Sequence, residues 1–93
     1  MVAVVRSDGH FVFVNAVLED VLGRPRSALH GMRLQDYLQD AREFEQALAG
    51  ARKNTFSRMR FDATLAHPDI AEPVLVHTMV AQPDEPDEIV VEL

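Results

Sequence analysis

Residues 15–31, NAVLEDVLGRPRSALHG, decide the fold because they interrupt a helix twice within a short span. Asn15 is a favourable N-cap, and Gly23 fits the left-handed residue that closes a helix. Ser27 is expected to cap a second, single-turn piece that stops at Gly31. Short helices that turn at both glycines can curl across a sheet, whereas one continuous helix would leave it.

Strand-forming sequence flanks this stretch on both sides. Residues 2–6 and 10–14 are rich in valine and phenylalanine, and Ser7-Asp8-Gly9 between them predicts a hairpin. The remaining expected elements are a short turn over 34–38, a helix over 41–53 stopped at Asn54, and strands over 55–65, 74–81 and 88–93, the last two separated by an acidic turn over 83–87. Helices confined between the second and third strands can cover only one face of a sheet. The sequence therefore predicts an α+β fold with five short strands in one sheet.

Composition limits the classes of function and the environment. Fifteen acidic against nine basic residues give a net charge of −6, which argues against nucleic acid as the partner. The absence of cysteine excludes disulfides and thiol chemistry. No apolar run approaches the length of a membrane span, and charges follow residue 5 too early for a signal peptide. We expect a cytoplasmic protein that does not bind a membrane.

The chain is expected to be a single domain, residues 1–93, cut from a longer protein. Strand-like sequence begins at residue 2 and continues to residue 93, whereas most native domains have a few poorly ordered residues at each terminus.

Periodicity predicts which side chains face the helix-covered side of the sheet. An apolar stripe marks one side of the 41–53 helix, and alternating apolar residues mark one side of the 55–65 strand. The residues expected to be buried there, either lining a small-ligand pocket or filling a packed core, are Leu22, Phe44, Leu48, Met59 and Phe61. A packed core is the favoured reading because the domain is so small.

The strand over 74–81 is apolar on both faces, which predicts an exposed apolar patch on the uncovered side of the sheet. The residues expected at this patch are Val74, Leu75, Val76, Met79 and Val80. A second copy of the chain would cover the patch economically, so we expect a homodimer.

The order of these elements resembles a PAS domain, with Asp8-Gly9 in the first turn, Asn15 opening the helix and Leu22-Gly23 closing it. Leu29-His30-Gly31 resembles the leucine-x-glycine step of that family. The resemblance implies an antiparallel sheet with strand order 2-1-5-4-3 and short helices over one face. It also implies a sensing or dimerising role inside a larger signalling protein.

A narrower similarity points to the N-terminal sensory domain of the nitrogen-regulation sensor histidine kinase, NtrB type. It is carried by residues 15–31, by 47–56 (ALAGARKNTF) and by 60–65 (RFDATL). The resemblance implies a parent kinase that acts on a response regulator and a PII-type regulator. It supplies no catalytic residue here, so this chain is not expected to be an enzyme.

Residue types argue against the common cofactors. The four histidines, His10, His30, His67 and His77, lack the spacing of a metal site. Haem-binding relatives usually place a histidine on the long helix, and flavin photoreceptor relatives need a cysteine, so no cofactor is expected. Two other classes stay open: the ligand-sensing domain of a transcription regulator, and a free-standing small-ligand carrier or enzyme.

Overall fold

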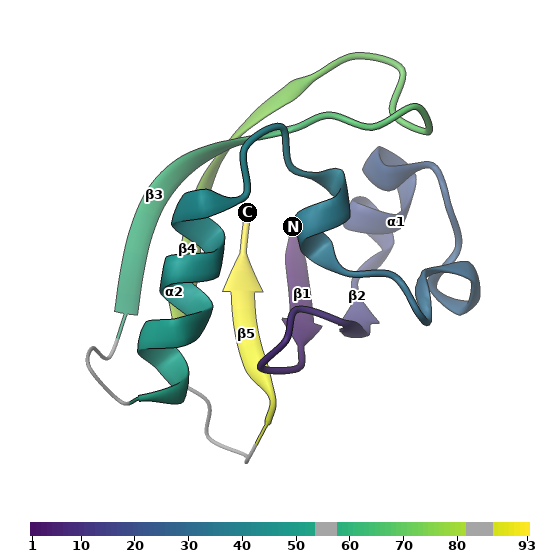
Figure 1. Cartoon of the computed structure of the whole chain (residues 1–93). Coiled ribbons are helices and arrows are strands. Elements are labelled where there is room, and N and C mark those ends of the chain that lie inside the picture. The colour runs from purple at the N-terminus through teal and green to yellow at the C-terminus, as the bar shows by residue number, and fades with distance from the viewer. Residues whose placement is uncertain (54–57, 82–86) are drawn as a thin grey trace.

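The computed structural model describes residues 1–53, 58–81 and 87–93. In chain order the elements are β1 (Val2–Val5), β2 (Phe11–Val14), α1 (Ala16–Leu22), the 3-10 helices η1 (Arg26–Leu29) and η2 (Leu34–Tyr37), α2 (Arg42–Arg52), β3 (Arg58–Leu65), β4 (Val74–Ala81) and β5 (Ile89–Glu92). The strands form one antiparallel sheet in the order β2-β1-β5-β4-β3, and the helices lie over one face of it (Figure 1). The predicted α+β fold and strand order are confirmed.

The double helix break occurs where the sequence predicts it. The Asn15 side chain accepts the backbone N–H of Leu18, and Gly23 ends α1 in the left-handed conformation at φ 75°. The second piece differs in detail, because η1 begins directly after Pro25 and therefore contains Ser27 instead of being capped by it. Pro25 itself is extended, and its carbonyl accepts the backbone N–H of Ala28 at 2.9 Å, which closes the turn.

The longer helix and the turn before it are slightly shorter than expected. Ala41 and Lys53 are the caps of α2, and Leu38 is the cap of η2. The predicted stop at Asn54, the first part of the 55–65 strand and most of the 83–87 turn lie outside the described residues.

The core lies between the sheet and the helices. Leu22 and Phe44 have no exposed surface, and Leu48 is 3% exposed. Met59 and Phe61 also face the helices but are only partly buried, so the prediction of full burial is wrong for these two. They lie on the first half of β3, where this edge strand has a neighbour on one side only. Further along β3, Leu65 has Leu38 on its other side and is fully buried.

The residues predicted for the uncovered face divide between the two sides of β4. Val76 and Val80 are 4% and 0% exposed and belong to the core, as does the inward, partly buried Val74. Leu75 and Met79 alone point away from the helices, because successive side chains of a strand alternate between faces. The predicted patch is therefore wrong for the three valines.

Candidate interaction surface and polar clusters

The side of the sheet away from the helices carries a continuous apolar row. Strand register places Phe13 beside Val4, Val4 beside Val90, and Val90 beside Ala81, across four strands. Phe13 is 38% exposed, and the guanidinium of Arg26 lies 5.3 Å from its ring centroid. We call Val4, Phe13, Met79, Ala81 and Val90 the outer face.

Charged residues border the outer face along β3 and β5. Met79 lies between Glu92 on β5 and Arg60 on β3. Next along β3 and β4, Nδ1 of His77 lies 2.7 Å from Oδ1 of Asp62, with both side chains largely exposed. The outer face is thus an apolar patch with a polar rim, which is typical of interaction surfaces.

In the part of the chain that the structure describes, the residues expected to line a pocket are not gathered around one of the hollows found at the surface. Leu22, Phe44 and Leu48 are packed in the core. Phe61 lines a surface hollow of about 410 Å³ whose other walls include His77 and Glu92. The favoured reading of a packed core holds for the three buried residues.

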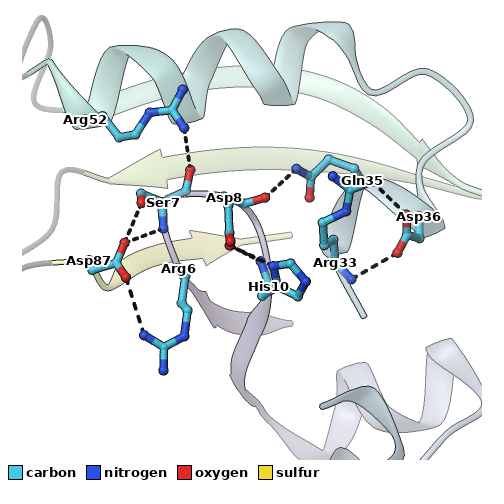
Figure 2. A network of polar contacts seen from close by, with 9 residues as sticks. All are labelled: Arg6, Ser7, Asp8, His10, Arg33, Gln35, Asp36, Arg52 and Asp87. Atoms are coloured by element: carbon cyan, nitrogen blue, oxygen red, sulfur yellow. Dashed lines mark hydrogen bonds and ion pairs between the residues drawn. The ribbon is translucent and has the colours of Figure 1, made fainter. Parts of the chain in front are cut away.

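The β1–β2 turn is the centre of a polar network (Figure 2). Ser7 donates its backbone N–H and its hydroxyl to the carboxylate of Asp87, and Arg6 donates to the same carboxylate. These hydrogen bonds, the Ser7 hydroxyl first, lower the pKa of Asp87. Arg52 at the end of α2 donates to the carbonyl of Ser7. The network joins the hairpin to the helix layer and to the entrance of β5.

Asp8 and Gly9 hold the other half of this turn. Gln35 of η2 donates to the carbonyl of Asp8, and a Cβ at Gly9 would lie 1.9 Å from the Gln35 side-chain oxygen. Asp8 also accepts the backbone N–H of His10, which is the main reason its pKa is lowered. Gly9 has φ 94°, a conformation that favours glycine, whereas the Gln35 side chain could move away from a Cβ. The Asp8-Gly9 turn chemistry expected from sequence is present.

A second polar cluster lies at the opposite end of the sheet, around the loop between β3 and β4. Figure 1 shows this loop, in green, reaching toward α1. Asp69 in the loop accepts a hydrogen bond from Nε of Arg24 at 2.5 Å and one from the hydroxyl of Tyr37 at 3.4 Å. The ring of His67 lies 4.3 Å from that of Tyr37, centroid to centroid. We call Arg24, Tyr37, His67 and Asp69 the Asp69 cluster.

The Asp69 cluster has members that lie far apart in the chain, so it could not be predicted from sequence. The only local signal is His67-Pro68-Asp69, a turn sequence with a side-chain acceptor at its first position. No spacing in the sequence predicts that Arg24 and Tyr37 belong to this cluster, because only the tertiary fold brings them to the loop.

The histidines are dispersed over the structure. His10 pairs with Asp8, His67 with Asp69 and His77 with Asp62, whereas His30 follows η1. Within residues 1–53, 58–81 and 87–93, no three histidine, aspartate or glutamate side chains are grouped as metal ligands. Among the helices that the structure describes, none has the length and apolar character of a membrane span.

The family model described as "PAS fold" matches residues 1–79. The chain therefore belongs to the PAS fold family. A search of the curated proteins finds no match.

Among solved structures, the PAS domain of an HTR-like protein from Haloarcula marismortui is similar over 98% of this chain and 76% of its own, with 21% identity and a TM-score of 0.75. A domain of a sensory box sensor histidine kinase/response regulator from Geobacter sulfurreducens is similar over 97% of this chain and 77% of its own, with 14% identity and a TM-score of 0.75. The photoactive yellow protein domain of the sensor histidine kinase Ppr from Rhodospirillum centenum is similar over 97% of this chain and 80% of its own, with 16% identity and a TM-score of 0.77. At these identities the similarity concerns the fold.

Proposed function

We propose that this chain is the sensing and dimerisation module of a cytoplasmic two-component sensor histidine kinase of the nitrogen-regulation (NtrB) type. The single observation that carries a sensory role is the PAS fold, matched by the family model over residues 1–79. Similar solved domains come from sensor histidine kinases, which supports a kinase as the parent protein. The narrower assignment, with a response regulator and a PII-type regulator as partners, rests on the resemblance of residues 15–31, 47–56 and 60–65.

In this proposal the outer face is the contact between two copies of the chain. The apolar row from Phe13 to Ala81 has no helix over it among the described residues. Leu75, at the other end of β4, is 66% exposed. A two-fold contact uses one patch for both subunits, so a single surface is sufficient. The patch mixes valine, phenylalanine and methionine, which are suited to the centre of an interface.

The chain ends give this contact a route to a following output domain. Leu93 donates its backbone N–H to the carbonyl of Met1 at 2.9 Å, and the amino group of Met1 donates to the carbonyl of Leu93 at 3.2 Å. The end of β5 is thereby fixed to the start of β1, and both strands contribute residues to the outer face. A shift of the dimer contact would move the segment after Leu93, and rigid shifts of this kind drive many signalling proteins.

The test is the protein encoded when the reading frame continues past Leu93. Incubated with ATP labelled at the γ-phosphate, it should acquire acid-labile phosphate on a histidine, and this phosphate should pass to a response regulator. Removal of residues 1–93 should change the rate of phosphate incorporation or the regulation of that rate. Binding to a promoter fragment without phosphate incorporation would contradict the kinase assignment and favour the transcription regulator.

A further inference from the structure

The loop between β3 and β4 contains a turn in which a ring nitrogen of His67 accepts a backbone hydrogen bond. Ile70 donates its backbone N–H to the carbonyl of His67 at 2.9 Å, which closes a four-residue turn with Pro68 at its second position. Inside this turn, Asp69 donates its backbone N–H to Nδ1 of His67 at 3.0 Å. Nδ1 can accept this hydrogen bond only when it carries no proton.

Asp69 connects the turn to α1. Its carboxylate accepts from Nε of Arg24, and its carbonyl oxygen would lie 2.6 Å from a Cβ at Gly23, the residue that ends α1. The turn therefore rests directly on the C-terminal end of that helix.

The surroundings of His67 contain further charged and titratable groups. Tyr37 of η2 packs its ring against His67 and donates its hydroxyl to Asp69, while Arg24 approaches from the end of α1. Asp36, also on η2, adds negative charge near Tyr37. The His67 side chain is 20% exposed, so protons from solvent can reach it.

We propose that His67 and Asp69 form a pH-sensitive latch that holds the β3–β4 loop against the end of α1. With neutral His67, Nδ1 fixes the Asp69 backbone N–H. When Nδ1 gains a proton it becomes a donor, and the nearest acceptor is the Asp69 carboxylate, 3.4 Å away. The Asp69 N–H then loses its acceptor, and His67 competes with Arg24 and Tyr37 for the carboxylate.

Histidine side chains in general change charge between pH 5 and 8, so this is the range over which the latch is tested. Asp69 itself stays ionised in that range, because the hydrogen bond from Arg24 lowers its pKa. The described change needs no partner or ligand and is independent of the kinase assignment. The latch would make the β3–β4 loop, at the opposite end of the sheet from the β1–β2 turn network, respond to pH.

Amide hydrogen exchange across pH 5–8, corrected for the intrinsic pH dependence of exchange, tests the latch on the 93-residue chain. Protection of the Asp69 amide should fall on the order of tenfold between pH 8 and pH 5.5, as expected when one hydrogen bond is lost. The Gly23 amide and the Arg24 Nε–H should shift in NMR spectra with the same midpoint as the His67 ring.

Two variants separate the latch from a general effect of pH. His67→Asn keeps an acceptor oxygen near the Asp69 N–H but cannot be protonated in this range, so the protection should persist at pH 5.5. His77→Asn is the matched control, because His77 also pairs with an aspartate, Asp62, but its side chain is 86% exposed and accepts from no backbone N–H of the described residues. It should behave as the unmodified chain. The proposal is overturned if His67 titrates while Asp69 protection and the Gly23 and Arg24 signals stay constant, or if the transition survives in His67→Asn.

Discussion

Gly23 and Asp69 are packed so closely that a methyl group on Gly23 would lie 2.6 Å from the Asp69 carbonyl oxygen. The same glycine ends α1 with φ 75°. One residue thus closes the first helix and provides the surface on which the β3–β4 loop rests. The helix break that the sequence predicts and the loop contact that it does not predict are two consequences of one missing side chain.

Gly23→Ala should destabilise the domain through backbone strain and a clash with backbone, together about 2–4 kcal/mol. Gly31→Ala is the control, since Gly31 also has a positive φ, 97°, but nothing lies within 4 Å of its would-be Cβ. Urea unfolding of both variants measures the difference. An equal loss in the two variants would show that the Asp69 contact does not matter.

Phe44→Ala should lower the free energy of unfolding by about 3–5 kcal/mol, because Phe44 is fully buried. Phe61→Ala should cost less, about 1–3 kcal/mol, because Phe61 is only partly buried at the sheet edge. Denaturant titrations of the two variants under identical conditions give the comparison. The reverse order would mean that the edge of the sheet is covered in solution.

The acid limb of stability should depend on Asp69. Hydrogen bonding to Arg24 holds the pKa of Asp69 below its usual value of 3.8 in the folded chain. The ionised carboxylate therefore contributes stability that is complete above about pH 4 and is lost as the pH falls through the lowered folded-state pKa.

Asp69→Asn should consequently make the urea midpoint less dependent on pH between pH 5 and 2. Asp20→Asn serves as the reference, since the Asp20 side chain is exposed on α1 and makes no hydrogen bond or ion pair with the described residues. An unchanged acid slope in Asp69→Asn would contradict the role of the Arg24 contact.

The purified chain should show no visible absorption from haem or flavin. No histidine lies on α2, and the sequence has no cysteine, so the ligands that such relatives use are missing. The ultraviolet–visible spectrum after dialysis is the measurement. A Soret band or a flavin band that survives dialysis would require a binding mode that these residues do not suggest.

Local patterns in the sequence predict the elements of this fold well. Asn15, Gly23 and the alternation along β3 each act over a few residues, so they can be recognised without a structure. Burial was harder to predict: Phe61 alternates like a core residue, but its exposure depends on β3 lying at the sheet edge. Likewise, Val76 and Leu75 are equally apolar, and only the position of the helices decides which of them is covered.

The polar clusters were beyond prediction for a different reason. Arg24 and Asp69 are 45 residues apart in the chain, and Ser7 and Asp87 are 80 residues apart. Charge and spacing carry no signal for such pairs, because only the tertiary fold brings their members together.

Sedimentation velocity is the most direct test of the proposed dimerisation through the outer face. The unmodified chain should sediment as a dimer at micromolar concentration, while Met79→Glu should be monomeric with an unchanged circular dichroism spectrum and thermal transition. Gln46→Glu, which places the same charge on the exposed side of α2, should remain dimeric. A wild-type chain that stays monomeric up to roughly 100 µM, or a Met79→Glu variant that still dimerises, would contradict the account.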